Sequence, residues 1–370
     1  MKALILQENL NKALSLAGKF ISNKIQLPIL SSFLLEAKEG QLFISASSLE
    51  AGVVIRVAAK IEEEGKIAIP ARIFGELVFG LPKEKISLTT DGLILKIAGG
   101  KHQSTINATS AAEFPAVPQK TTTPQLAFSR KTLIDVAAQV SFAASLDEGR
   151  PAITGALVVL SKRDLSFVAT DGFRMSLKKV EVQKNTEEEW PPLIIPAKIL
   201  TEVGKIAQDK EDGAGMIFAP EGNQVLFVWE DVVLSSRLID GKFPPYEKII
   251  PISATTRIVV DRDELLKSIK LASLFAREGA NIIKIKIGGE NIKIVANTPQ
   301  LGGSENEIEA KIEGEENEIA FNSRYLLDYL GGAASSQIQI ELTGPLAPGV
   351  FLFTEDPSYK HIIMPVRVQD

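Results

Sequence analysis

The clearest pattern of apolar and polar positions lies over residues 167–177. An apolar strand pattern runs over residues 167–170 into Asp171-Gly172 and then resumes. Asp tolerates the left-handed backbone region and Gly enters it freely, so this pair favours a tight turn. The segment therefore predicts a β-hairpin, and by itself it is typical of a surface hairpin.

Two other segments repeat this pattern. A strand-like run enters a polar turn at residues 44–50 and again at residues 294–300. The three copies lie about 125 residues apart, and self-similarity at a fixed period indicates stacked copies of one unit. Because that spacing corresponds to a whole small domain, we predict three similar domains.

The first copy shows the plan of elements. A strand at residues 4–6 precedes a helix that we expect Asn9 to cap, with apolar residues at helical spacing up to Phe20. Several strands follow, and then Pro70 opens a second helix at its favoured first position. More strands close the copy.

The other copies follow the same plan. Residues 194–200 of the second copy closely match residues 68–74 of the first, and residues 319–327 take this place in the third. There Asn322 and Ser323 supply the predicted cap. Short hairpin links dominate, so each copy is predicted to be an α+β unit of two helices and a mostly antiparallel sheet.

Two links divide the copies. The stretches near residues 118–124 and 250–256 are rich in Pro and Thr. We therefore predict domains over residues 1–120, 121–251 and 252–370.

Composition excludes some classes of protein. The 370 residues are 45% apolar, so each copy can bury a core, and no cysteine is present for disulfides or thiolate metal sites. We expect no signal peptide at the start. We also expect no membrane span, because no apolar run approaches the ~18 residues that one needs, and a cytoplasmic location fits. The net charge of -5 argues against a simple basic nucleic-acid binder. Acidic residues cluster in predicted turns while lysines and arginines fall more often in the predicted helices, so a basic inner surface remains possible.

Motifs for catalysis are largely missing. Neither a phosphate-binding Gly-rich loop nor a Gly-x-Ser-x-Gly elbow occurs. The two histidines, His102 and His361, are far apart, and each is expected to be a surface or strand residue and not a metal ligand. We therefore expect no catalytic residues, no metal and no cofactor. Carboxylate pairs are plentiful, so counting alone leaves a hydrolase with a carboxylate site between copies open.

Four motifs in order carry a resemblance to a known family. They are residues 27–30 (LPIL), 169–174 (ATDGFR), 240–246 (DGKFPPY) and 364–368 (MPVRV). With the threefold repeat, the chain resembles the bacterial DNA polymerase III beta subunit, the beta sliding clamp, over nearly its whole length. The resemblance implies the DNA clamp fold and a head-to-tail homodimer that forms a ring of six domains. It also implies a processivity factor without catalysis that encircles duplex DNA and tethers the replicative polymerase.

The resemblance implies a basic lining of the ring. Lys and Arg facing phosphates give sequence-independent, salt-sensitive attraction that permits sliding. The positions of Lys24 and Arg72 match DNA-contacting positions of the family, and the others rest on helix placement. The candidate DNA-binding residues are Lys12, Lys24, Arg72, Lys198, Lys205, Lys267, Lys270 and Arg324.

The resemblance also implies an apolar groove between the second and third copies, into which the polymerase, the clamp loader and other partners insert a short peptide. The candidate residues are Arg150, Ile153, Thr170, Gly172, Phe173, Arg174, Met175, Pro244, Lys248, Ile249, Tyr325, Leu346, Ile362, Met364, Pro365, Val366 and Arg367. Some positions depart from the family's pattern: Phe173 where His is frequent, Lys248 for Arg, Pro348 for a small polar residue, and the added Gln369 and Asp370. These departures bear on which peptide the groove prefers.

For the contact between subunits, the family's interface positions fall on Ile106, Leu274 and Phe275. Ser104 stands where a large apolar residue can occur, so Leu274 and Phe275 are the better candidates for energetic hot spots. Two alternatives to the clamp remain at this point: the hydrolase above, and a scaffold that binds proteins but never DNA.

Overall fold

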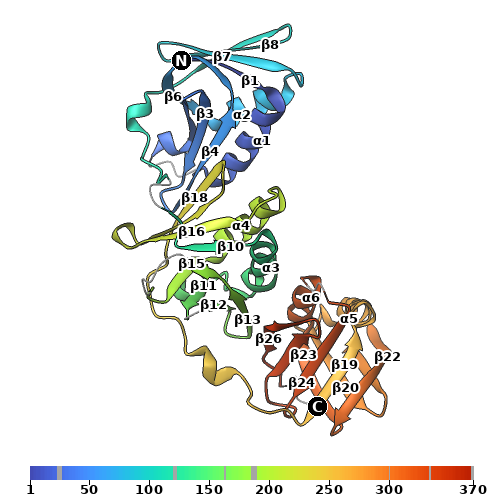
Figure 1. Ribbon diagram of the computed structural model, residues 1–370. Coiled ribbons are helices and arrows are strands. Elements are labelled where there is room, and N and C mark those ends of the chain that lie inside the picture. Colours follow the sequence, from blue (N-terminus) through green and yellow to red (C-terminus); the bar gives the residue numbers. More distant parts are fainter. Residues whose placement is uncertain are drawn as a thin grey trace. The chain divides into compact units, whose positions relative to one another are not determined.

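The computed structural model describes residues 1–22, 27–119, 123–161, 164–184, 190–299, 301–332 and 335–367 (Figure 1). The chain divides into two compact units. Unit 1 holds residues 1–129, 184–186 and 212–238, and unit 2 holds residues 130–183, 187–211 and 239–370.

The first copy lies in unit 1 and contains two helices. Its elements are β1 (Lys2–Leu6), α1 (Gln7–Ala17), β2 (Ser32–Lys38), β3 (Gln41–Ser47), β4 (Ala51–Ala58), β5 (Lys60–Glu63), β6 (Gly65–Pro70), α2 (Ala71–Gly80), β7 (Lys85–Asp91), β8 (Ile94–Gly99) and β9 (His102–Asn107). One sheet has the order β5-β1-β7-β8-β9, and β4-β3-β2-β6 form one end of a second sheet.

The second copy repeats the plan and contributes to both units. Its elements are β10 (Leu126–Phe128), α3 (Arg130–Val140), β11 (Gly155–Leu160), β12 (Asp164–Thr170), β13 (Arg174–Glu181), β14 (Gln183–Lys184), β15 (Leu193–Pro196), α4 (Ala197–Gln208), β16 (Ala214–Ala219), β17 (Gln224–Val228) and β18 (Val232–Arg237).

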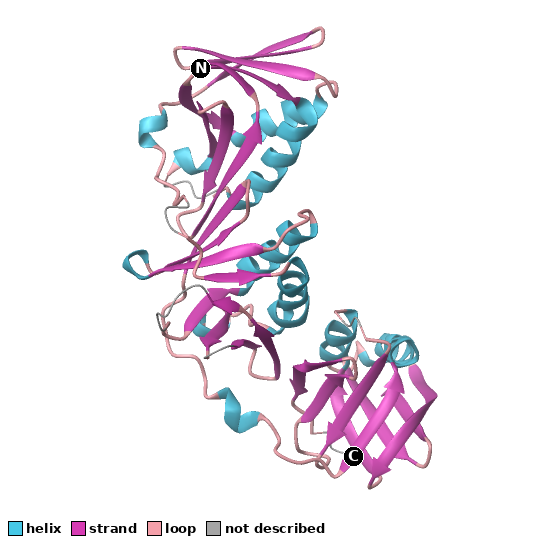
Figure 2. Cartoon of the chain, viewed as in Figure 1, coloured by secondary structure: helices cyan, strands magenta, loops and turns pink. Residues whose placement is uncertain are grey.

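The third copy lies in unit 2, where α5 and α6 pack together beside its strands (Figure 2). Its elements are β19 (Thr256–Asp261), α5 (Arg262–Ala276), β20 (Ile282–Gly288), β21 (Asn291–Thr298), β22 (Gly302–Gly314), β23 (Asn317–Asn322), α6 (Ser323–Gly331), β24 (Gln337–Leu342), β25 (Gly349–Phe353) and β26 (Asp356–Ile363). The expected α+β fold of three similar, mostly antiparallel copies is confirmed. The domain boundaries at residues 120 and 251 remain predictions.

Neighbouring copies are joined by strand pairing. The last strand of the second copy, β18, pairs with β4 of the first, with Leu234 opposite Val53. In the same way β26 of the third copy pairs with β13 of the second, with His361 opposite Ser176. Sheets therefore run without interruption through both joints, which explains why the second copy is shared between the two units.

The helix starts test the predicted caps. Asn322 accepts a hydrogen bond from the backbone N–H group of Arg324 and caps α6 as predicted, while Ser323 is the first residue of that helix and its hydroxyl has no hydrogen-bond partner. Asp261 caps α5 in the same way as Asn322, accepting from the N–H groups of Asp263 and Glu264. The cap at Asn9 is wrong, because α1 already begins at Gln7.

A side chain at the start of one helix binds the end of the other in every copy. The Nε2 group of Gln7 donates to the Val78 carbonyl, 2.7 Å away, near the end of α2. Arg130, the first residue of α3, donates to the carbonyls of Ala207 and Gln208 in α4, and Arg262, the first of α5, donates to Leu330 in α6. The last turn of a helix leaves carbonyls without intrahelical partners, and these side chains supply donors.

Candidate functional site

The turn between β12 and β13 is held by its own side chains. The Asp171 carboxylate accepts from the N–H groups of Phe173 at 2.9 Å and Arg174 at 3.0 Å, while the Thr170 hydroxyl accepts from Gly172 at 3.0 Å. Gly172 adopts φ of 94°, which disfavours a residue with a side chain. The turn directs Phe173 outward, 59% exposed.

Arg174 connects the second copy to α6 of the third. Its side chain, only 10% exposed, pairs with Asp171 at 3.0 Å and with Asp328 at 2.6 Å. A third bond reaches the Phe142 carbonyl at 2.9 Å, and the guanidinium lies 4.6 Å from the centre of the Tyr325 ring. Charge-assisted bonds and ring contacts together fix this side chain at the joint.

The segment after β26 is fixed by two backbone bonds. The Met364 N–H donates to Phe173 and the Val366 N–H donates to Ala320, each at 2.8 Å. Met364 is 39% exposed and its backbone is bonded to that of Phe173, so two exposed apolar residues are neighbours at the surface of the joint. Such a surface, with polar groups nearby, has the chemistry of a peptide-binding groove.

An apolar cluster forms the floor beneath this surface. Met175 and Ile362, each 1% exposed, pack with Leu177 and Val350. Tyr246, from the connection between the copies, packs against the same cluster. The floor thus draws side chains from the second copy, the third copy and the segment between them.

The predicted groove residues differ in accessibility. Ile153, Thr170, Met175 and Ile362 are buried, and Arg174, Tyr325, Pro365 and Val366 are partly buried. Those exposed are Arg150, Gly172, Phe173, Pro244, Lys248, Ile249, Leu346, Met364 and Arg367. Gln369 and Asp370 lie outside the described residues. The assignment of the seventeen residues to one groove stays a prediction, and the residues that hold Arg174, namely Asp328 and Phe142, were missed from the sequence.

A buried polar group lies under the same joint. The Nδ1 atom of His361 is 2.8 Å from the Ser176 hydroxyl, and that hydroxyl is 3.2 Å from Tyr359. The His361 ring stacks on Tyr329, with centroids 5.1 Å apart. Burial, and then the charge of Arg174, lowers the pKa of His361 well below its usual value. His361 is therefore a neutral buried strand residue, and His102 is exposed on β9.

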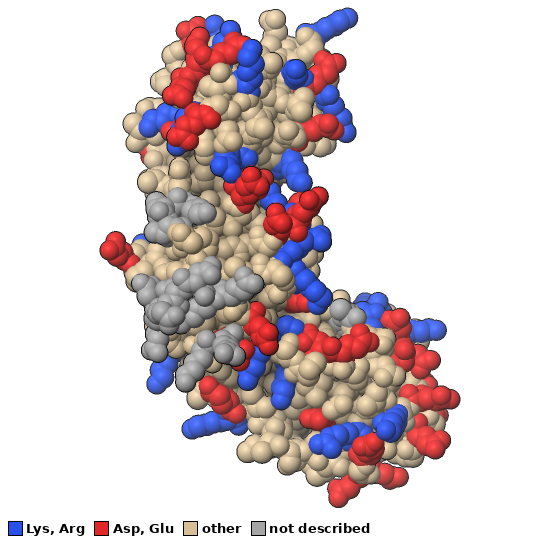
Figure 3. All heavy atoms as spheres, in the orientation of Figure 1, with Lys and Arg blue, Asp and Glu red and all other residues tan. Residues whose placement is uncertain are grey.

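The candidate DNA-binding residues are exposed wherever they are described. They are Lys12 on α1, Arg72 on α2, Lys198 and Lys205 on α4, Lys267 and Lys270 on α5, and Arg324 on α6, while Lys24 lies outside the described residues. Three of them, Arg72, Lys198 and Arg324, occupy the second position of α2, α4 and α6. The face in view in Figure 3 intermixes both signs of charge, and Arg72, for example, pairs with Glu76 at 3.0 Å.

The three candidate interface residues have different surroundings. Leu274 on α5 is 52% exposed. Phe275 is partly buried and packs against the core of the third copy. Ile106 lies on β9, opposite Leu95, and is 6% exposed. Its side chain is therefore part of the core of its own copy.

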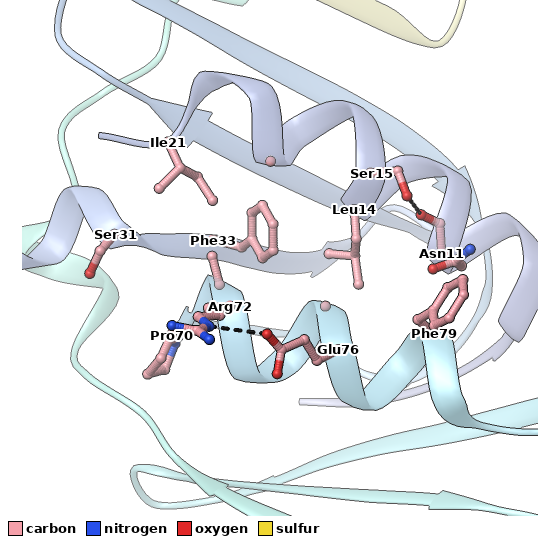
Figure 4. A pocket seen from close by; sticks show the side chains of 13 residues that line it. Asn11, Leu14, Ser15, Ile21, Ser31, Phe33, Pro70, Arg72, Glu76 and Phe79 are labelled. Atoms are coloured by element: carbon pink, nitrogen blue, oxygen red, sulfur yellow. Dashed lines mark hydrogen bonds and ion pairs between the residues drawn. The ribbon is translucent and has the colours of Figure 1, made fainter. Parts of the chain in front are cut away.

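A groove of about 810 Å³ lies between α1 and α2 (Figure 4). Leu14, Phe33 and Phe79 contribute apolar surface, and the Arg72–Glu76 pair lies along the α2 side of the groove. Among the described residues no three His, Cys, Asp or Glu side chains gather to hold a metal ion. In the same described part of the chain, no helix is long and apolar enough to cross a membrane.

Comparisons with known proteins agree along the whole chain. Family models match in succession: DNA polymerase III beta subunit N-terminal domain over residues 1–118, central domain over residues 127–245 and C-terminal domain over residues 247–367. The beta sliding clamp of Staphylococcus aureus strain Mu50 is 30% identical over 360 residues, covering 94% of each chain.

Solved structures agree as well. The DNA polymerase sliding clamp from Bacillus subtilis is 30% identical with a TM-score of 0.93, and the DNA polymerase III beta subunit from Thermotoga maritima is 29% identical with a TM-score of 0.90. Each covers 100% of both chains. The chain therefore belongs to the beta sliding clamp family, the processivity clamps that serve DNA polymerase III as accessory subunits and are not themselves catalytic.

Proposed function

We propose that two copies of this chain close head to tail into a ring around duplex DNA in the cytoplasm. The ring binds DNA without reading its sequence and holds the replicative polymerase, the clamp loader and other partner proteins at the joint between the second and third copies. Membership of the clamp family supports this proposal. The observation that carries it for this chain is the strand pairing that joins the copies.

The joints within the chain predict the joint between chains. In each, the last strand of one copy pairs with the strand after the hairpin turn of the preceding copy. Two strands at corresponding places remain: β9, an edge strand, and residues 302–309 of β22, which pair only with β21 in the part of the chain that the structure describes. A strand edge exposes unpaired N–H and C=O groups that can pair with another chain. Two chains joined β9 to β22 in both directions make a closed head-to-tail ring.

The same argument gives a register. Ser176 is opposite Ala169 across its hairpin, as Ser304 is opposite Ala296, so Ser304 corresponds to Ser176. The residues that lie opposite one another in β1, β7, β8 and β9 can be followed across the sheet, beginning at the strand before α1. Ser104 of β9 then occupies the position in the first copy that His361 occupies in the third. Since Ser176 and His361 are paired, we expect Ser104 to lie opposite Ser304 of the second chain.

An exposed leucine supports this arrangement. Leu274 is the thirteenth residue from the start of α5, and Phe142 is the thirteenth from the start of α3. Phe142 packs against the core of the next copy, with its ring 5.3 Å from that of His361. Leu274 is 52% exposed, so we expect it to cover the first copy of the second chain in the same way.

Engineered disulfides test the ring directly. The chain has no cysteine, so Ser104→Cys with Ser304→Cys introduces one pair for each expected joint. Directly opposed strand residues have the Cα separation that a disulfide needs. Mild oxidation should give a covalent dimer of the double variant, while either single variant stays monomeric in denaturing gels. Absence of the covalent dimer, with the chain folded, would overturn the register.

The crosslinked ring also tests DNA encirclement. With its clamp loader, the reduced protein should be retained on nicked circular DNA and lost after linearisation. A ring that is oxidised after loading should resist denaturant on the circle yet still slide off a linear end. Equal retention on linear and circular DNA would indicate ordinary binding and refute encirclement.

Two exposed side chains test the peptide groove. Phe173→Ala with Met364→Ala should weaken binding of a fluorescent partner peptide by about tenfold or more, because both substitutions remove apolar surface that the peptide would cover. Leu49→Ala is the matched control, since Leu49 is 49% exposed at the corresponding turn of the first copy. Equal peptide affinity for both variants would place the groove elsewhere.

A further inference from the structure

We propose that each joint between two chains of the ring carries a second groove for an extended peptide, and that this groove is complete only in the closed ring. Its walls include Leu93 and Ile94 of one chain and Leu301 of the second chain, which are 56%, 39% and 58% exposed in the single chain. The proposal rests on the ring described above and adds a site that one chain alone does not contain. The positions follow from the threefold repeat, because each joint should bring corresponding residues together.

The hairpin between β7 and β8 corresponds to the turn before β25 of the third copy. Opposed residues can be followed across β1, β7 and β8 in the first copy and across β19, β24 and β25 in the third, beginning at the strand before α1 or α5. Leu93 and Ile94 then occupy the positions of Ala347 and Pro348. Those two residues directly follow Leu346, a predicted groove residue that is 61% exposed. The first copy therefore presents apolar side chains where the third copy presents one wall of its predicted groove.

A backbone bond after the last strand of the first and third copies supports this correspondence. The Val366 N–H donates to a carbonyl three residues before α6, and the Thr109 N–H donates to a carbonyl three residues before α2. The two helices therefore align residue by residue, and Ile73, the third residue of α2, occupies the position of Tyr325 in α6. Ile73 is 54% exposed, so it is a further apolar side chain of the first copy that lies open to solvent.

Leu301 corresponds to Phe173 of the second copy. Each residue ends a hairpin turn and directly precedes the next strand, β22 or β13. At the joint between the second and third copies, the Phe173 carbonyl accepts a hydrogen bond from Met364, the first residue after β26. The corresponding bond between chains places Leu301 beside Asn107, which lies opposite Ile94 in the sheet of the first copy. Apolar side chains of two chains therefore meet at this joint.

The joint between chains also lacks a side chain that fills the joint between the second and third copies. There the Arg174 guanidinium lies between the rings of Phe142 and Tyr325, 5.2 and 4.6 Å from their centres. Gly302, the first residue of β22, stands at the place of Arg174, and the aliphatic residues of α5 and α2 matched above replace the two rings. Smaller side chains at all three places leave an apolar hollow. Atoms that line an unfilled hollow lose dispersion contacts, so an apolar side chain entering it is stabilised.

The surroundings favour a peptide as the occupant. Two apolar places result, the hollow at Gly302 and the surface formed by Leu93, Ile94 and Leu301. An extended peptide points alternate side chains to the same side, so two apolar residues separated by one other residue can fill both places. None of these positions carries a cation, so the phosphates of a nucleic acid gain little there.

The disulfide-closed ring tests this groove with the peptide Ser-Leu-Gly-Phe-Ser, its phenylalanine replaced by photoreactive benzoylphenylalanine. On irradiation the ring should be labelled near residues 93–94 and 301, as located by mass spectrometry, with half-maximal labelling below about 1 mM peptide. The Leu274→Asp, Phe275→Asp monomer should lose this labelling by about tenfold or more, and equal labelling of the monomer would refute a groove between chains. Failure of the disulfide to form would overturn the ring register together with this groove. A covalent ring without label at these residues would overturn the groove alone.

Variants in the closed ring provide a matched comparison. Leu93→Ser with Ile94→Ser, or Leu301→Ser alone, should weaken the peptide about tenfold or more, because each change removes apolar surface that the peptide covers. These side chains are exposed in the single chain, so its thermal midpoint without peptide should not change. Leu6→Ser is the control, since Leu6 is 49% exposed in the same copy but lies opposite Lys85, at the other end of β7 from the hairpin. Equal peptide affinity for the control and for the groove variants would contradict the assigned walls.

Discussion

Arg174 should be the side chain whose loss weakens the joint between the second and third copies most. Arg174→Met keeps the length of the apolar stem and removes the guanidinium. The bond to the Phe142 carbonyl is charge-assisted and contributes about 1.5–3 kcal/mol. The ring contact with Tyr325 contributes about 1 kcal/mol, and the pair with Asp328, which is 47% exposed, less than about 1 kcal/mol.

These contributions are partly offset because the variant no longer has to desolvate a charge. We therefore expect a loss of about 3 kcal/mol in the free energy of unfolding of unit 2, a change of roughly 150-fold in its equilibrium constant. Arg150→Met is the control. Its single pair, with Asp147 at 3.0 Å, joins side chains that are both more than half exposed, and should contribute less than about 1 kcal/mol.

The two tryptophans allow unit 2 to be followed alone. Trp190 belongs to unit 2 and Trp229 to unit 1. In a Trp229→Phe background, denaturant unfolding monitored by fluorescence reports on Trp190. A loss below about 1 kcal/mol for Arg174→Met, or one equal to that of Arg150→Met, would refute the assigned role.

Three further predictions concern the helices and the buried histidine. Changing Arg72, Lys198 and Arg324 together to Ala should reduce the salt dependence of DNA binding. The slope of the logarithm of the binding constant against the logarithm of salt concentration should become shallower by about 0.9 for each phosphate that is no longer neutralised. An unchanged slope would show that these three residues do not line the DNA channel. Leu274→Asp with Phe275→Asp should give monomers in sedimentation, and a variant that still runs as a dimer would refute that placement. Because burial lowers the pKa of His361, the unfolded chain binds a proton more readily than the folded one, so stability should fall as the pH drops below about 6.5, by up to about 1.4 kcal/mol per unit. His361→Leu should remove that part of the pH dependence, and parallel curves for both proteins would contradict the reasoning.

Local chemistry made some features predictable. Asp171 and Gly172 specify their turn through side-chain capping and backbone freedom, and those forces act within a few residues. The caps at Asp261 and Asn322 are predictable for the same reason. The threefold plan follows because each local pattern recurs at similar spacing.

Other features depend on residues that only the fold brings together. Asp328 reaches Arg174 from 154 positions away, and no periodicity marks that pair. α1 begins at Gln7 and not after Asn9, because the side chain of Gln7 donates a hydrogen bond to the Val78 carbonyl of α2. That contact outweighs the local capping preference of Asn9. Ile106 sits in a short polar strand whose alternation does not reveal which face is buried.

The hydrogen bonds from Gln7, Arg130 and Arg262 to the other helix of the same copy have a mechanical consequence. Sliding one helix past its partner in any copy would break a bond to a carbonyl that has few alternatives. Each copy should therefore resist shear as a stiff block, and deformation should concentrate where one block meets the next. If two chains form the proposed ring, opening it at a joint between chains would separate paired strands and the side chains packed across that joint, and it would leave both helices of each copy bonded to each other.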